Sequence, residues 1–407
     1  MRKDELSIFT QSRTLGNKNK YLDSLGEHSI VLNQAISYDG VRGMSRYLLS
    51  ALNNNSIIRN DYIFINDINQ LGISKNIDIM NRLSRYDDQG RYFKKLEFKI
   101  QKALSDEKPF ILFSHIEFLH FPFANLSDPE LLNYLNRQKN ISTKDLNERL
   151  PFFLALVPYD GLSKTFLNFF KPLSFSDSLS YGFKVFKDPV SLNKWKQNPS
   201  FANDIKVLRK FYKTRLNTLD TYLENFLKPR EMDSFIYLVG CHGQPFLEQG
   251  EFLHGNGIDE GVANIPAFIH MPKMKERINL NQQVGMISIA NTIKELVNQK
   301  LENDKFVNYA KQELEEKIIL QFDCRGQRFA IRYDGKSKYV QDFATGKKEF
   351  YNLVNDPFMK RNIIDELSQD QRSFFQNNLY DLFLHKLSSS AKELPSTGYC
   401  PYQIKLK

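Results

Sequence analysis

The sequence predicts an α/β fold with a central, mainly parallel β-sheet flanked by helices. Short apolar runs bounded by turn residues are typical of buried strands, and they occur at 110–113, 152–157, 234–239 and 267–271. Between and after these runs, apolar residues recur at helical spacing at 91–103, 207–227, 284–297 and 370–387. This alternation is typical of a parallel sheet that helices cover on both faces.

The C-terminal part has a different pattern, which predicts a small antiparallel subdomain. Apolar and polar residues alternate with a period of two at 317–322, 328–333 and 337–342. The pairs Arg325-Gly326 and Asp334-Gly335 separate these segments and are typical of hairpin turns. We therefore expect an α/β domain over residues 1–309 and a subdomain of antiparallel strands and a terminal helix over 310–407.

The composition is that of an ordinary soluble globular protein. Of the 407 residues, 41% are hydrophobic and 25% charged. The net charge of +9 suits an anionic ligand, although Lys and Arg are scattered among acids, so a solvated basic surface is the simpler explanation. Because the chain has no long basic run, we expect no nucleic-acid partner.

The N-terminal residues and the cysteine content indicate a cytoplasmic protein. No apolar stretch has signal-peptide length, and none reaches the roughly 20 residues that a membrane span needs. The three cysteines are too few and too dispersed for a disulfide framework. The sequence leaves the oligomeric state open.

A candidate site follows the predicted strand at 234–239. Cys241 and His242 come directly after this strand, and ligands of open α/β sheets bind at the carboxyl ends of the strands. His254 lies in a glycine-rich segment that could fold back over the same edge. Two histidines and a cysteine placed in this way can bind a metal ion or an anion, although Cys241 could equally be a small buried apolar residue.

The order of motifs around this site resembles the sulfatase family of the alkaline-phosphatase superfamily. The family has a strand followed by Asp-His-Gly, a glycine-rich loop with a second His, acidic residues and an apolar segment containing Pro. His242-Gly243, His254-Gly255, Asp259-Glu260 and the segment 265–269 occur here in that order. The C-terminal segment 335–357 is similar to the family's C-terminal strand and the Asp-Pro turn that follows it.

A second match lies upstream, and the resemblance as a whole extends over roughly residues 90–365. The segment 109–123 contains His115 and His120 and is similar to the family's strand ending in His, followed by His-x-Pro-aromatic. The resemblance implies an alkaline-phosphatase-like fold, a substrate-facing role for His120, and hydrolysis or transfer of a sulfate or phosphate ester, with a glycan ester as the expected partner. Without the resemblance, both histidines would be ordinary residues at a strand end.

The N-terminal catalytic motifs of the family are altered in this chain. The resemblance places Thr10, at the end of an expected first strand, where the family has a metal-binding Asp, and Arg42 where it has the nucleophile. Of the nucleophile motif only Ser45 and Arg46 remain, which makes them candidate catalytic residues together with His120 and His254. Ser45 is also a plausible helix N-cap.

The altered motifs change the expected metal. Replacing two carboxylates, one of them by Cys241, leaves Ca²⁺ poorly compensated, whereas thiolate and imidazole suit Zn²⁺. We expect a divalent metal, zinc rather than calcium, with Cys241 and His242 as ligands and Asp39 as the nearest N-terminal acidic candidate.

Two functions remain open at this point. The chain is an ester hydrolase or transferase, or it is a catalytically inactive relative that keeps an anion-binding pocket for binding or assembly. A third alternative is that Met1 is not the true start and that upstream sequence is missing, but the segment around Thr10 resembles an altered first strand, which favours the other two.

Overall fold

The computed structural model describes residues 1–9, 20–38, 63–66, 91–105, 110–114, 116, 118–120, 123–124, 128–138, 140–157, 185–186, 188–248, 252, 258–299, 303–323 and 326–390. The chain divides into two compact units. The first comprises Met1–Leu71, Phe98–His115 and Glu224–Lys407, and the second comprises Gly72–Glu97 and Ile116–Leu223. Each unit is described by itself.

The first unit contains the described strands and most of the short helices. Its strands are β1 (Ser29–Ile36), β2 (Ile63–Asn66), β3 (Phe110–Phe113), β4 (Ile236–Val239), β5 (Asn264–Ile265), β6 (Ala267–His270), β7 (Ile278–Gly285), β8 (Ile318–Phe322), β9 (Arg328–Tyr333), β10 (Ser337–Asp342) and β11 (Lys348–Asn352). Its helices are α1 (Lys20–Glu27), α13 (Glu260–Ala263), α14 (Met286–Gln299), α15 (Asn303–Glu313) and α16 (Gln369–Ser390), with 3-10 turns at Lys3–Glu5, Ser7–Phe9, Lys228–Arg230 and Ile364–Glu366.

The central sheet is built around β1, which pairs in parallel with β7 and antiparallel with β5 and β6. Strand β4 pairs antiparallel with β6, so β1, β4 and β7 run in one direction and β5 and β6 in the other. Strands β2 and β3 form a separate parallel pair. The prediction of a mainly parallel central sheet is therefore not confirmed, because the described strands form a mixed sheet.

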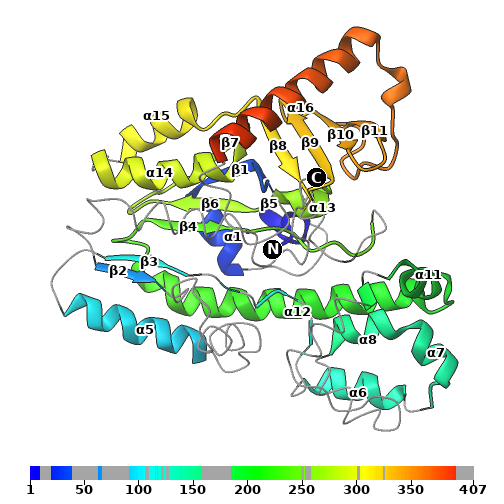
Figure 1. Ribbon diagram of the computed structural model, residues 1–407. Helices are drawn as coiled ribbons and strands as arrows, with labels where there is room; N and C mark the ends of the chain where they lie inside the picture. Colours follow the sequence, from blue (N-terminus) through cyan, green and yellow to red (C-terminus); the bar gives the residue numbers. More distant parts are fainter. Residues whose placement is uncertain are drawn as a thin grey trace. The chain divides into compact units, whose positions relative to one another are not determined.

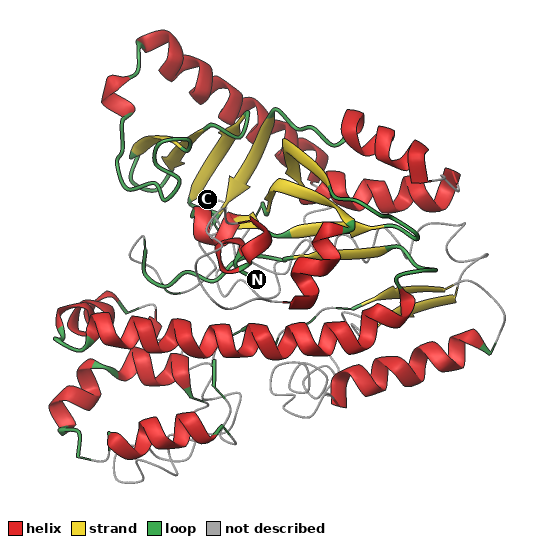
Figure 2. Cartoon of the chain, turned by 180° about the vertical axis from the view of Figure 1, so that it is seen from behind, coloured by secondary structure: helices red, strands yellow, loops and turns green. Residues whose placement is uncertain are grey.

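Helices cover both faces of the central sheet, as predicted (Figures 1 and 2). On one face, Ile30 and Leu32 of β1 are fully buried against Ile289 of α14 and Phe306 of α15. On the other face, Phe268 of β6 contacts Phe9 at 5.2 Å between ring centroids and lies beneath α1. Burial of each such side chain contributes about 1.5–3 kcal/mol, so this sandwich fixes the position of the strand ends.

The predicted antiparallel C-terminal strands are confirmed. Strands β8 to β11 form a meander in the order β11-β10-β9-β8. The turn between β9 and β10 has positive φ angles at Asp334 (51°) and Gly335 (65°), and this left-handed conformation is one that Asp and Gly adopt readily in tight hairpin turns.

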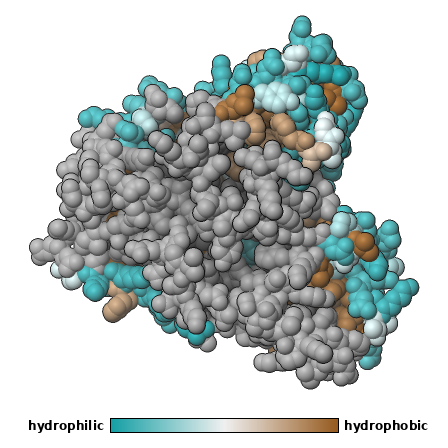
Figure 3. All heavy atoms as spheres, viewed as in Figure 1, coloured by the Kyte–Doolittle hydropathy of each residue, from teal (hydrophilic) through white to brown (hydrophobic). Residues whose placement is uncertain are grey.

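Helix α16 covers one face of this sheet through Phe375 and Leu379, which join a buried cluster with Ile331 and Tyr339. The surface of this region is mainly hydrophilic, with a few exposed apolar side chains (Figure 3).

The second unit is mainly helical in its described part. It contains α6 (Pro129–Arg137), α7 (Thr143–Glu148), α8 (Leu150–Leu156) and α11 (Pro189–Gln197), and α5 (Arg91–Leu104) and α12 (Phe201–Leu227) contribute residues to both units. At its centre Arg149 forms an ion pair with the fully buried Asp204, with an Nη2–Oδ1 distance of 2.6 Å. The indole of Trp195 donates to the same carboxylate at 2.9 Å.

Two predictions about local structure are wrong. Residues 152–157 were expected to form a strand, but they belong mostly to α8, where Pro151 occupies the first turn and the apolar side chains are buried all round. Ser7–Phe9 forms a 3-10 turn rather than the end of a first strand. The helices predicted at 91–103, 207–227, 284–297 and 370–387 are confirmed as α5, α12, α14 and α16.

No helix within the described residues is long and apolar enough to cross a membrane.

Candidate active site

The candidate site begins where β4 ends. The backbone nitrogen of Gly240 donates to the carbonyl oxygen of Pro266 at 2.9 Å, which extends the pairing of β4 and β6 by one step. Cys241 and His242 follow, and both side chains are half-buried. The predicted position of this pair, directly after the carboxyl end of a strand, is therefore found in the structure.

Gly243 holds this turn against α13. Its backbone nitrogen donates to the carbonyl oxygen of Val262 at 2.8 Å. A Cβ atom at this position would lie far inside van der Waals contact with the carbonyl oxygen of Gly261. Only glycine fits this close approach of two backbones, which explains why the residue after His242 has no side chain.

The ring orientation of His242 determines its tautomer. Nδ1 lies 2.7 Å from the carbonyl oxygen of Gly243. Because a carbonyl oxygen only accepts, this hydrogen bond assigns the proton to Nδ1, and the neutral ring then carries its lone pair on Nε2. A backbone carbonyl in this role is typical of histidines that bind a metal ion or act as a base.

The N-terminal residues lie against the same turn. The nitrogen of Met1 donates to the carbonyl oxygen of His242 at 2.6 Å. The side chain of Arg2 is 1% exposed; it donates to the carbonyl oxygen of Gln244 at 3.1 Å and to Glu248 at 2.5 Å. Two buried charge-assisted contacts of this kind fix the backbone that follows His242.

A buried ionic cluster anchors the segment after the glycine-rich loop. Glu260 is 6% exposed and forms ion pairs with Arg332 of β9 and with Lys338 of β10, the latter at 2.9 Å. Lys338 also donates to the carbonyl oxygen of Ile258. Burial alone would raise the pKa of Glu260, but the two cations outweigh it and lower the pKa to about 2. The carboxylate is therefore ionised and ties residues 258–260 to the C-terminal sheet.

Lys3 adds a cation next to this cluster. Its Nζ donates to the carbonyl oxygen of Asn33 and to Asn264 Oδ1, the latter at 3.3 Å. Burial and, secondarily, the charge of Arg332 lower the pKa of Lys3 to about 8.

The structure brings together only part of the predicted site. Cys241 and His242 are adjacent in the first unit, whereas His120 is a half-buried residue of the second unit. The other predicted catalytic residues, Ser45, Arg46 and His254, lie outside the described residues, as do Thr10, Asp39, Arg42 and His115. Convergence of these side chains on one pocket therefore stays a prediction.

The described residues do not complete a metal site. Within them, no group of three or more His, Cys, Asp or Glu side chains is placed to hold a metal ion. Cys241 and His242 supply two donors of the kind that zinc prefers. Any further ligand would have to come from a residue outside the described part.

Sequence reasoning missed the charged residues that surround the site. Three of these residues, Arg2, Lys3 and Arg332, belong to no sequence motif. Their roles depend on contacts between segments far apart in the chain, which the sequence does not reveal. Lys338 and Glu260 belonged to motifs, but nothing in the sequence indicated that they pair. An alternation of polar and apolar residues at 278–281 could have indicated the amide-bearing face of β7.

The fold is shared with sulfatases and phosphonate monoester hydrolases of known structure. The protein BT4656, solved in complex with its substrate D-glucosamine-2-N,6-O-disulfate, matches with a TM-score of 0.57 at 14% identity, over 93% of this chain and 94% of that chain. The putative sulfatase yidJ from Bacteroides fragilis matches with a TM-score of 0.57 at 12% identity, over 95% and 94%. The phosphonate monoester hydrolase of Agrobacterium radiobacter matches with a TM-score of 0.57 at 13% identity, over 95% and 94%.

No family model and no curated relative matches the chain. The structural matches extend along nearly the whole chain, and they agree with the resemblance that the motifs around His242 and His120 indicate. This chain therefore has the fold of the sulfatases and phosphonate monoester hydrolases of the alkaline-phosphatase superfamily.

Proposed function

We propose that the chain binds an anionic sulfate or phosphate ester, with a glycan ester as the expected class, and hydrolyses it or transfers its group. The observation that supports this most is the position of Cys241 and His242 at the carboxyl end of β4. They occupy this position in a fold shared with a protein whose substrate is D-glucosamine-2-N,6-O-disulfate.

The roles follow from the chemistry of each side chain. His242 would bind a metal through Nε2 and Cys241 through its sulfur, and this pair of donors favours zinc over calcium as the divalent metal. Ser45 is the proposed nucleophile and Arg46 its neighbouring cation. His120 and His254 would contact the ester oxygens. A metal bound by these donors would supply charge stabilisation for the ester oxygens.

A second candidate function is binding without turnover. It is favoured by Cys241, which stands where the resemblance places an Asp, and by Arg42, which stands where it places the nucleophile. Removing one member of a catalytic unit lowers the rate about as much as removing several. Such a protein would therefore turn over an ester at least about a thousandfold more slowly than an enzyme with an intact site. The pocket would then serve recognition of the anionic ester.

Turnover of aryl sulfate, aryl phosphate and aryl phosphonate esters separates the two functions. We would compare the wild type with His242→Ala and Ser45→Ala, and with His28→Ala as a control, because His28 is exposed and belongs to a different surface. Turnover of about 1 per second or faster that only the first two variants abolish supports the enzyme with Ser45 as nucleophile.

Two other outcomes decide the alternatives. If Ser45→Ala keeps the activity that His242→Ala loses, the nucleophile is a different group, such as water. If the wild type is inert but D-glucosamine-2-N,6-O-disulfate raises its melting temperature, and His254→Ala removes this effect, the binding function is correct. Failure of both tests would refute the proposed function.

A further inference from the structure

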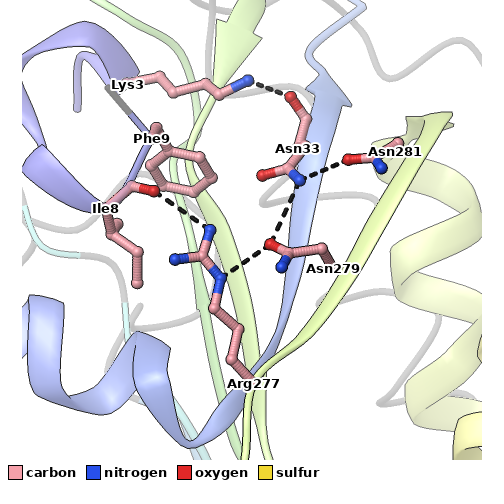
Figure 4. A pocket seen from close by; sticks show the side chains of 7 residues that line it. All are labelled: Lys3, Ile8, Phe9, Asn33, Arg277, Asn279 and Asn281. Carbon is pink, nitrogen blue, oxygen red and sulfur yellow. Dashed lines mark hydrogen bonds between the residues drawn. The ribbon is translucent and has the colours of Figure 1, made fainter. Parts of the chain in front are cut away.

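A pocket lies in the first unit, where the N-terminal segment crosses β1 and β7 (Figure 4). Its volume is about 440 Å³, within the range of about 300–1,000 Å³ that is typical of small-molecule sites. Lys3, Phe9 and Asn33 are among the residues that line it. It lies near the turn after β4, because Lys3 is two residues from Met1, which contacts His242.

Three asparagines form one wall of this pocket. Asn33 Nδ2 donates to the Oδ1 atoms of Asn281, at 2.7 Å, and of Asn279, at 3.3 Å. Both Oδ1 atoms are thereby turned toward Asn33, and the two Nδ2 groups are turned away from it (Figure 4). Within the described part of the chain, neither of these Nδ2 groups donates to a protein acceptor. The wall therefore offers amide N–H donors from Asn279 and Asn281, and it also presents an acceptor, Asn33 Oδ1, on the side of Phe9 (Figure 4).

Two cations complete the polar lining. Arg277 donates from Nε to Asn279 Oδ1 at 2.7 Å and from Nη2 to the carbonyl oxygen of Ile8 at 3.2 Å. Its Nη1 also pairs with Glu27, which lies outside the pocket, at 3.5 Å. Lys3 Nζ lies 5.1 Å from the ring centroid of Phe9 and donates to the backbone of Asn33. No carboxylate is among the described residues that line the pocket.

We propose that this pocket is a binding subsite for an anionic sugar. The sulfate, phosphate or carboxylate group accepts hydrogen bonds from Arg277 and Lys3. The Glu27 carboxylate that pairs with Arg277 is 63% exposed, so solvent screens its competition with the ligand. The sugar hydroxyl groups accept from the Nδ2 groups of Asn279 and Asn281. The Phe9 ring provides an apolar face for the sugar C–H groups. The choice of a sugar ester rests on the proposed function, whereas binding here requires no catalysis.

An isosteric substitution tests the subsite directly. Asn281→Asp keeps the oxygen that accepts from Asn33 but replaces the N–H donor by a negative oxygen inside the pocket. Asn291→Asp on α14 is a matched control, because it makes the same charge change at an exposed position that does not line the pocket. The affinity for D-glucosamine-2-N,6-O-disulfate would be measured by titration calorimetry, with uncharged D-glucosamine as a second probe.

We expect Asn281→Asp to weaken binding of the disulfate by at least about tenfold, because the substitution removes a hydrogen-bond donor and places a negative charge beside a doubly charged anion. Asn291→Asp should change the affinity less than about threefold, and Arg277→Gln should also weaken binding. Affinity for the disulfate should fall with added salt and exceed the affinity for D-glucosamine. Melting temperatures of the variants establish that they are folded.

The test also separates this subsite from the site at the end of β4. His242→Ala should retain binding of the disulfate in this pocket. If His242→Ala abolishes binding and Asn281→Asp does not change it, the sugar binds only at the end of β4, and the subsite is wrong while the proposed function stands. Equal effects of the two Asn→Asp variants, or no binding by the wild type, would also overturn the subsite.

Discussion

Replacement of Glu260 by Gln should destabilise the protein strongly at neutral pH. The carboxylate lies between Arg332 and the fully buried Lys338, and the isosteric amide would leave both cations without their counter-ion. Breaking a buried ion pair by removing one partner costs about 3–5 kcal/mol. The lowering of the Glu260 pKa from 4.5 to about 2 corresponds independently to roughly 3 kcal/mol, which agrees with this range.

The sign of the pH dependence follows from the lowered pKa. A group whose pKa is lower in the folded state stabilises that state fully above its unfolded pKa, here near pH 4.5. The contribution is lost as the pH falls toward 2, so roughly 1 kcal/mol should remain at pH 3. The difference between wild type and Glu260→Gln should therefore be largest above pH 5 and should shrink by more than half at pH 3.

Urea unfolding followed by far-ultraviolet circular dichroism at pH 7, 5 and 3 measures this difference. Glu315→Gln is the matched control, because Glu315 is exposed in the same unit. The role assigned to this cluster is refuted if the unfolding free energy of Glu260→Gln lies within about 1 kcal/mol of the wild-type value at pH 7. It is also refuted if the difference between the two unfolding free energies does not change with pH.

Three further outcomes are expected. Gly243→Ala should destabilise the protein by at least about 1–3 kcal/mol, because its Cβ would collide with the Gly261 carbonyl. The urea midpoint should therefore fall, and an unchanged midpoint would contradict this packing. Asp204→Asn should lower the unfolding free energy by about 3–5 kcal/mol and move the unfolding transition reported by Trp195 fluorescence to lower urea concentration. An unchanged transition would indicate that the ion pair contributes no more than an exposed one. Protein purified without chelator should contain zinc or no metal, and elemental analysis that finds stoichiometric calcium would exclude the assignment of Cys241 as a ligand.

Patterns local in sequence predicted much of the fold. The apolar run before Gly240 became β4, and Asp334-Gly335 became a hairpin turn with two positive φ angles. Residues 152–157 show the limit of this reasoning, because a short, wholly apolar run has no periodicity that separates a buried strand from a buried helix. There the Pro at position 151, in the first turn of α8, was the better signal.

The strand at the centre of the sheet was not predicted. Ser29–Ile36 mixes five apolar residues with Asn33 and Gln34, and its burial depends on β6 and β7, which follow it by more than 200 residues. The direction of β5 and β6 depends on the same long-range pairing, so the sequence could not distinguish a mixed sheet from a parallel one.

The candidate site was predictable only where its residues are adjacent in the chain. Cys241 and His242 follow from a strand end. In contrast, Glu260 pairs with residues 72 and 78 positions further along the chain, and the pocket around Asn33 joins the N-terminal part to β7. The sequence does not indicate these contacts, because Lys, Arg and Asn are scattered along the chain and any of them could have formed such contacts.

The central claim, that the carboxyl end of β4 binds an anionic ester, is tested most directly by the resonances of the histidine side chains. With isotope-labelled histidine, the signal of His242 is identified by its loss in His242→Ala, and that of His28 by its loss in His28→Ala. Titration with D-glucosamine-2-N,6-O-disulfate should shift the His242 signal and saturate, whereas a shift of the His28 signal alone would report binding near Arg277, which pairs with the adjacent Glu27. An unchanged His242 signal at ligand concentrations that saturate the protein would contradict the claim.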